Sequence, residues 1–236
     1  MHTPLARILD HMSLRDFSVR KWVKLRLAAP AKPWPGFDTG PRDPLKEFCA
    51  RLAERPAPRV LELGTLRSIA GRSTLHREWA PHAAEHLGTD IEAGADVDVV
   101  ADVHALSATL GEESFDALIS CSTFEHLKYP HLAAHEVMKV LKVGGLLFTQ
   151  THQSFPIHAY PFDYFRFSRE ALAGLFGTRM GFEVLATNYC FPASIWARET
   201  PGGHLHPAYL NTNLFGVKTA ATPKAYVYEL EYRPVP

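Results

Sequence analysis

The sequence has little of what marks a disulfide-bonded or a nucleic-acid-binding protein. Its 236 residues include only three cysteines, which lie far apart and form no Cys-x-x-Cys pair. Neither a disulfide framework nor a structural zinc site is therefore expected. Lysine plus arginine and aspartate plus glutamate number 25 each. This zero net charge speaks against a nucleic-acid partner, because binding to phosphates usually requires a basic surplus.

Long apolar runs are absent as well. No stretch of the sequence is long and apolar enough to span a bilayer. Charged residues such as Arg7 and Asp10 interrupt the N-terminal segment, where a signal peptide would be apolar. With 46% hydrophobic residues, the chain suits a globular protein with a substantial core. We expect a cytoplasmic protein without a membrane span, and a homodimer is compatible with this composition.

The chain divides into an N-terminal extension and a main domain. Residues Pro4–Ala29 have apolar side chains at helical spacing and a basic polar side, and the proline-rich residues 29–37 predict a linker. The helical segment could pack on the domain, close over an acceptor site, or meet an anionic membrane or partner. We predict the helical extension and linker over residues 1–40 and the main domain over residues 41–236.

Strands and helices alternate in the main domain. Apolar runs predict strands over Arg59–Leu63, His86–Asp90, Val97–Val100, Phe115–Ser120, Leu146–Gln150, Phe182–Thr187 and Ala225–Tyr232. Helical spacing predicts helices over Pro44–Glu54, Ser73–Ala80 with Ser73 as its cap, His131–Leu141 with a glycine C-cap at Gly144–Gly145, and Ser168–Phe176. This alternation predicts an α/β fold: a Rossmann-like, doubly wound, mainly parallel seven-stranded sheet with an N-terminal helical extension.

Sheets of this kind bind ligands at the carboxyl ends of their strands, so the residues there carry functional weight. The first strand ends at Gly64, which lets a ligand approach the backbone closely, and it contains Glu62, which must face solvent or meet a cationic partner. Asp90 ends the second strand, where an acid can bind both hydroxyls of a ribose or cap a turn. Asp102 follows the third strand, where a carboxylate can accept the amino group of adenine.

These motifs together resemble the class I S-adenosylmethionine-dependent methyltransferases, and most of all the subgroup with a small-molecule or saccharide acceptor. The resemblance runs from about Arg59 to Phe176 and is carried by residues 60–64, 88–91, 101–104, 114–119, 124–127 and 136–147. The last stretch is similar to the family's helix followed by Leu-Lys-Pro-Gly-Gly, with Val143 in place of the proline.

The resemblance implies S-adenosyl-L-methionine as the cofactor and assigns roles to the first motifs. By this analogy Glu62 and Gly64 border the methionine part of the cofactor. Asp90 binds the ribose, and Ile91 contacts the adenine. The family usually has a Gly-x-Gly turn after the first strand, and the second glycine is missing here. The loop must therefore take another path, with Thr65 or Arg67 as candidates to touch the methionine carboxylate.

The same analogy assigns the remaining cofactor contacts. Asp102 and Val103 hold the amino edge of the adenine, and Cys121, Ser122 and His126 line the floor under the sulfonium. A nicotinamide-dependent oxidoreductase is disfavoured, because no Gly-x-Gly-x-x-Gly opens a helix after the first strand. A non-catalytic ligand-binding or scaffolding domain of the same fold is the alternative to an enzyme.

The segment after the fifth strand, residues 151–167, borders the expected pocket and is rich in histidine and aromatic residues. It resembles the His-x-x-Pro-x-Asp-Tyr-x-Arg-Phe loop of a bacterial subgroup that often accompanies glycan or natural-product pathways. An alcohol acceptor benefits most from a base, and histidine suits this role. His152 is the first candidate, followed by His158 and Asp163. Each could instead be structural, with Asp163 orienting a histidine or pairing with Arg166.

A metal site is another use for these side chains. His152, His158, Asp163, His204 and His206 offer nitrogen and oxygen ligands, but a His-x-His pair in a loop is a weak signal, so no metal is expected. The sequence thus predicts a methyltransferase for a small molecule, with O-methylation of a natural product or saccharide favoured over N-methylation. The acceptor is expected to stack against aromatic side chains, namely Tyr160, Phe162, Tyr164 or Phe165.

Overall fold

The computed structural model describes residues 39–196 and 205–228. The chain forms two compact units, of which the larger comprises residues 38–191 and 210–236 and the smaller comprises residues 1–37 and 192–209. The predicted N-terminal helix lies outside the described residues. Within the smaller unit, the described residues are the extended segments 192–196 and 205–209.

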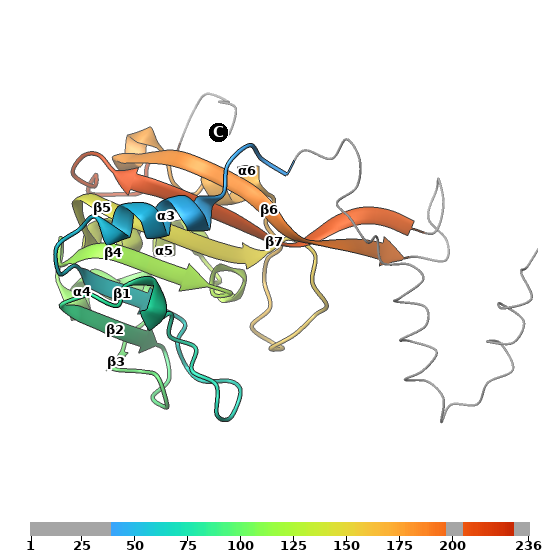
Figure 1. The fold of residues 1–236 in the computed structure, drawn as a ribbon, viewed down its shortest axis with the longest axis horizontal. Helices are drawn as coiled ribbons and strands as arrows, with labels where there is room; N and C mark the ends of the chain where they lie inside the picture. Colours follow the sequence, from blue (N-terminus) through green and yellow to red (C-terminus); the bar gives the residue numbers. More distant parts are fainter. Residues whose placement is uncertain (1–38, 197–204, 229–236) are drawn as a thin grey trace, which may run out of the picture. The chain divides into compact units, whose positions relative to one another are not determined.

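A seven-stranded sheet organises the fold (Figure 1), in the order β3-β2-β1-β4-β5-β7-β6. The strands are β1 (Arg59–Leu63), β2 (Glu85–Asp90), β3 (Val99–Val100), β4 (Phe115–Cys121), β5 (Leu141–His152), β6 (Phe182–Trp196) and β7 (Leu205–Lys218). The first five strands are parallel, and β7 pairs antiparallel with β5. The predicted mainly parallel, doubly wound sheet is therefore confirmed. The strand order reverses between β1 and β4, so a ligand site is expected at their carboxyl ends.

Four helices and four short 3-10 turns connect the described strands. The helices are α3 (Pro44–Ala53), α4 (Leu106–Leu110), α5 (Pro130–Val140) and α6 (Arg169–Ala173). The 3-10 turns are η2 (Arg77–Trp79), η3 (Val103–Ala105), η4 (Phe124–His126) and η5 (Thr178–Met180). Two helix starts follow from local chemistry: the Asp43 side chain accepts two backbone N–H groups of α3, and Ser168 caps α6 as predicted.

The sheet is buried on both faces, because successive side chains of a strand point to opposite sides. In β1, Val60 faces the core under α3, whereas Leu61 faces the core under α5. Figure 1 shows α3 lying across one face of the sheet. On that face Phe48 packs against Phe148 with ring centroids 5.6 Å apart, and Trp79 meets Phe148 edge-on at 5.5 Å.

The predicted helix over Ser73–Ala80 is wrong. The structure has an irregular loop there that ends in the single turn η2. Side chains from distant strands take the backbone N–H groups that a helix would need: Thr74 donates to Asp96 at 3.0 Å, and His76 donates to Glu62 at 2.9 Å. Such side-chain bonds compete directly with helix formation.

Two further predictions near β5 and β7 are wrong. The glycines expected to cap α5 lie inside β5, which begins at Leu141 directly after the helix. Residues 225–228 of the predicted last strand are not extended in the sheet, and the rest of that segment lies outside the described residues. The strand that pairs with β5 is β7, whose first residues were assigned to a loop because prolines and glycines surround them.

Substituting Phe148→Ala tests the packing under α3. Phe148 is fully buried and contacts both Phe48 and Trp79, so we expect the variant to lose about 3–5 kcal/mol of unfolding free energy. Urea denaturation measures the loss. Leu132→Ala, at a leucine that is 42% exposed, is the control and should cost about 1 kcal/mol or less. Equal losses in the two variants would contradict this account of the core.

Candidate active site

The carboxyl ends of β2 and β3 bring two of the predicted acids to one edge of the sheet. Asp90 is paired in register with Val100, and the backbone N–H of Ala101 donates to the carbonyl of Asp90 at 2.9 Å. Asp102 follows directly. The two carboxylates predicted to hold the two ends of an adenosine therefore project from neighbouring strands at the same end.

Asp90 keeps acceptor capacity for a ligand. Its carboxylate accepts the backbone N–H groups of Leu66 at 3.1 Å and Glu92 at 3.3 Å. A carboxylate offers about four acceptor positions, so two remain after these bonds. The next residue, Ile91, leaves 65% of its surface exposed, which gives this edge an apolar side chain beside the acid.

Asp102 is half exposed and ionised. Its carboxylate accepts the backbone N–H of His104 at 2.9 Å and the Nδ1–H of the same ring at 2.7 Å. Burial alone raises the pKa of Asp102, but these hydrogen bonds outweigh it and lower the pKa. Val103 is buried beneath. Asp102 and Val103 thus place a charged hydrogen-bond acceptor beside a buried apolar side chain.

Gly64 is required by the shape of the β1 carboxyl end. Its φ angle of +70° lies in the left-handed region, which glycine adopts most readily, and its N–H donates to the Thr89 carbonyl at 2.8 Å. A β-carbon at this position would run into the side chain of Thr123, which donates to the Leu63 carbonyl at 3.1 Å. The close approach at this glycine is therefore to the segment that follows β4.

Glu62 is buried and contacts two histidines, which can carry a positive charge. It is 2% exposed. One carboxylate oxygen contacts Nε2 of His86 at 2.9 Å and accepts the backbone N–H of His76 at 2.9 Å, while the other contacts the His76 ring. Burial raises the pKa of Glu62, but the histidine hydrogen bonds outweigh it and lower the pKa. Glu62 thus fixes the end of the loop that follows Gly64.

The loop over residues 65–76 is held by side chains. Arg67 binds Asp96 through two nitrogens at 2.8 and 2.7 Å, and Asp96 also accepts the N–H of Thr74 at 3.0 Å. Thr65 is buried, and its carbonyl accepts the Thr74 hydroxyl. The Arg67 guanidinium, a candidate for the methionine carboxylate, is therefore committed to Asp96 in this structure.

The predicted floor residues lie at the end of β4. Cys121 is its last residue, and burial raises the pKa of the thiol far above its usual range, which keeps it protonated. Ser122 follows with a φ angle of +53°. His126 lies in η4, and its Nδ1 contacts the Phe162 carbonyl at 2.7 Å. A carbonyl only accepts, so Nδ1 carries a proton.

Sequence reasoning missed Glu125, which organises the acceptor side. Its side chain is completely buried, and one oxygen accepts the Thr151 hydroxyl at 2.6 Å. The other lies 2.9 Å from Nδ1 of His152. The Glu125 carbonyl accepts the N–H groups of Tyr164 and Phe165 at 2.9 and 3.1 Å. An acid inside the apolar motif at residues 124–127 was the available signal.

His152 is the last residue of β5 and is 6% exposed. Its ring stacks flat on Phe155, with centroids 4.0 Å apart and an angle of 8°. The ring of His158 lies 4.8 Å from His152 and 4.8 Å from His126. Three histidines from η4, β5 and the following loop are thus brought together, of which two were predicted as catalytic and one as a cofactor contact.

Asp163 pairs with Arg166, which is the structural alternative that the sequence offered to a catalytic role. Its two oxygens lie 2.5 and 2.8 Å from the guanidinium, and one accepts the N–H of His158 at 2.9 Å. The Arg166 guanidinium holds the pKa of Asp163 far below its usual range. Asp163 therefore fixes the loop over residues 153–167, named the acceptor loop after its expected role, and the place of His158, and it is a poor base.

The acceptor loop exposes aromatic side chains. Tyr160 is 88% exposed, and Phe162, Tyr164 and Phe165 are exposed to lesser degrees. A pocket in this loop is lined by Phe155, Ile157, Asp163, Tyr164, Phe165 and Arg166. Of the other histidines that were considered as possible metal ligands, His206 lies in the smaller unit and His204 lies outside the described residues.

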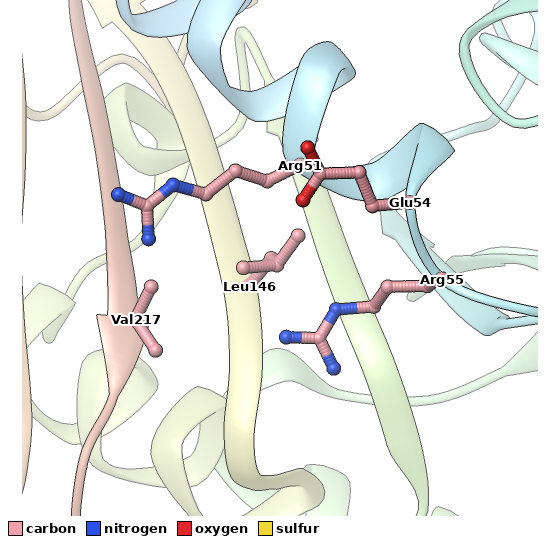
Figure 2. Close-up of a pocket in the computed structure, with 5 residues that line it drawn as sticks. All are labelled: Arg51, Glu54, Arg55, Leu146 and Val217. Atoms are coloured by element: carbon pink, nitrogen blue, oxygen red, sulfur yellow. The ribbon is translucent and has the colours of Figure 1, made fainter.

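A second pocket lies at the opposite end of the sheet (Figure 2). It is lined by Arg51, Glu54, Arg55, Leu146 and Val217. Leu146 begins the part of β5 that pairs with β7, and Val217 is its partner near the end of antiparallel β7. This pocket is therefore at the amino ends of the parallel strands, away from the edge where such sheets bind their ligands.

Substituting Glu62→Gln tests the link between Glu62 and the loop. The variant should lose about 1–3 kcal/mol of unfolding free energy at pH 7. Because the folded-state pKa of Glu62 is lowered, its contribution is complete above the unfolded value of about 4.3 and is lost as the pH falls through the folded value. Urea denaturation should therefore show the wild type and the variant converging below about pH 4. A gap that persists into acid would contradict this role, and Glu78→Gln at an exposed glutamate is the control.

Comparisons with known proteins agree with this fold. Residues 70–149 match the family model for a methyltransferase domain. The YcgJ protein from Bacillus subtilis shares the fold with a TM-score of 0.53 and 16% identity, over 75% of this chain and 98% of that one. A SAM-dependent methyltransferase from Archaeoglobus fulgidus has a TM-score of 0.51 and 14% identity, over 74% of this chain and 94% of that one. No curated protein matches the sequence significantly.

Across residues 39–196 and 205–228, no helix has the length and hydrophobicity needed to cross a membrane. The strand order, the two acids at one edge of the sheet and the sequence match are consistent with one another. The chain therefore has a Rossmann-like fold, and its residues 70–149 are similar to a methyltransferase domain.

Proposed function

We propose that the chain is an S-adenosylmethionine-dependent methyltransferase that acts on a small-molecule acceptor, with a hydroxyl of a natural product or saccharide favoured over an amine. The observation that carries the proposal is the position of Asp90 and Asp102. They come from adjacent strand ends of a methyltransferase domain, and the Asp102 carboxylate is half exposed while the Asp90 carboxylate keeps free acceptor positions.

The residues at this edge fit an adenosine. Asp90 would accept the ribose hydroxyls with its remaining acceptor positions, and the exposed side chain of Ile91 would cover one face of the adenine. Asp102 would accept the exocyclic amino group while Val103 supports the ring from below. An ionised acceptor paired with an apolar surface is the combination that a nucleoside requires.

The methionine part of the cofactor would lie over the end of β1. Gly64 and Thr65 form the backbone there, and Glu62 would act indirectly by fixing the loop through His76. Cys121, Ser122 and His126, at the end of β4, would form the floor. S-adenosylmethionine supplies a methyl group on a positively charged sulfur, so the protein has to place the acceptor atom and deal with its proton.

The acceptor would bind against the loop over residues 153–167. Its exposed aromatic side chains offer stacking surfaces for a sugar or an aromatic ring. We propose that His152 activates the acceptor hydroxyl, because it is the histidine at the strand end and Glu125 lies 2.9 Å away. His158 stands beside it, and Asp163 holds His158 in place.

Isothermal titration with S-adenosylmethionine tests the cofactor site. Asp90→Ala removes a charged acceptor and should weaken binding by about 1.5–3 kcal/mol, or roughly tenfold to a hundredfold. Glu92→Ala, at an exposed acid two residues further along the same loop, is the matched control and should bind as the wild type does. An affinity unchanged by Asp90→Ala would remove Asp90 from the site. No binding by the wild type at millimolar cofactor would favour the non-catalytic scaffold.

A turnover assay tests the acceptor side. S-adenosylhomocysteine release is followed with a panel of hydroxylated sugars and phenols. His152→Ala should lower the rate by about a hundredfold or more, as expected for the loss of a group that assists proton transfer, and it should leave cofactor affinity unchanged. His131→Ala, on α5, is the control. Full activity in His152→Ala would show that the activating group lies elsewhere.

A further inference from the structure

Buried groups that can bind a metal gather at the carboxyl ends of β4 and β5. One nitrogen or oxygen atom from each of Glu125, His152 and His158 lies within 4.8 Å of the other two. A second set, made of His126, His158 and Asp163, meets the same criterion and shares His158. Glu125 and His152 are buried, whereas the second set is partly exposed, so the first set carries the argument.

Two atoms of the first set are unsatisfied. Oε1 of Glu125 and Nδ1 of His152 are both inaccessible to solvent, and neither has a hydrogen-bond partner among the described residues. They lie 2.9 Å apart without the alignment of a hydrogen bond. Within the described residues, the ion pairs of Glu125 are with His126 and His152. A buried carboxylate is costly to leave in this state, because its charge is neither solvated nor fully paired.

The spacing of these atoms suits two ligands of one cation. Nitrogen and oxygen ligands bind zinc-like ions at about 2.0–2.2 Å, so neighbouring ligands on one ion are roughly 2.8–3.6 Å apart, from octahedral to tetrahedral geometry. The separation of 2.9 Å between Glu125 and His152 lies at the short, octahedral end of this range. For His158, Nδ1 contacts the Pro156 carbonyl at 3.1 Å, so Nε2 is the ring nitrogen that remains for an ion.

The surroundings also hold the three side chains in place, as outer contacts do in metal sites. The Thr151 hydroxyl binds the second oxygen of Glu125 at 2.6 Å. Phe155 stacks on the His152 ring. The backbone of His158 is tied to Asp163, which is itself held by Arg166. The ligand groups are thus fixed by the protein before any ion arrives.

We propose that Glu125, His152 and His158 bind one divalent transition-metal ion. Two imidazoles and one carboxylate form the ligand set that first-row ions such as Zn²⁺, Fe²⁺ and Co²⁺ accept, with at least one position left open. The role of the ion rests on the proposed function: a hydroxyl of the acceptor would occupy the open position, where the cation lowers its pKa and lets its proton leave to water. His152 would then activate the acceptor as a ligand.

The test uses the full chain without a histidine tag, stripped with a chelator and then titrated with Co²⁺ and, separately, Zn²⁺. Cobalt bound by two nitrogens and one carboxylate gives visible absorption bands that hydrated cobalt lacks. We expect saturation at one equivalent, and calorimetry should show one site for Zn²⁺. Absence of the bands at millimolar Co²⁺, or of Zn²⁺ binding, would overturn the proposal.

Variants assign the site. Glu125→Gln keeps the shape and a partner for Thr151 but removes the charge, and His158→Asn removes one imidazole. Each should weaken Zn²⁺ binding by about tenfold or more. Loss of an outer contact typically weakens metal binding by about that factor, and loss of a ligand itself should weaken it at least as much. His131→Asn is the control and should bind as the wild type does. Circular dichroism confirms that each variant is folded. Binding unaffected by both site variants would place the ion elsewhere and contradict the proposal.

Cofactor titration of the same stripped protein separates the two ideas. If S-adenosylmethionine binds but neither metal does, the metal site fails and the proposed methyltransferase function stands. If one equivalent of metal binds through Glu125 and His158 while the cofactor does not bind, the metal site stands and the proposed function fails.

Discussion

Two buried glutamates at the ends of the central strands hold this site together. Glu62 lies in β1 and Glu125 follows β4, on either side of the point where the strand order reverses. Neither carboxylate reaches solvent, so each depends on the groups packed around it. The glutamates thereby fix the segments that contact them: the loop over residues 65–76 through His76 and the acceptor loop through Thr151, His152 and the Glu125 carbonyl.

The two glutamates differ in how well they are satisfied. Both oxygens of Glu62 have partners in His76 and His86, so its role is complete within the chain. Glu125 leaves one oxygen without an aligned partner, next to a histidine nitrogen in the same condition. This difference is the reason that we propose a metal ion at Glu125 and not at Glu62.

Local sequence signals were enough for the elements that depend on burial alone. The apolar runs predicted β1, β2, β4 and the centre of β5 closely, and the serine signal predicted the start of α6, because these features are set by neighbouring residues. The failures involve long-range partners. Ser73–Ala80 has helical spacing, but Glu62 and Asp96 take its N–H groups. Glu125 looks like one acid in an apolar motif, and only the fold brings His152 to it. The sequence did predict that Asp90 and Asp102 lie at one edge of the sheet, because the carboxyl ends of parallel strands lie at the same edge.

The missing second glycine after β1 fits this pattern. A Gly-x-Gly turn holds its shape through backbone conformation, whereas this loop is held by the Arg67–Asp96 pair and by Glu62. The acceptor loop is built in the same way, with the Arg166–Asp163 pair and Glu125. The loops that follow β1 and β5 are thus each fixed by one arginine–aspartate pair and one buried glutamate. Paired side chains with defined geometry restrict a loop as a special backbone turn does, so the departure from the glycine pattern changes how the loop after β1 is held and leaves the carboxyl end of β1 in place.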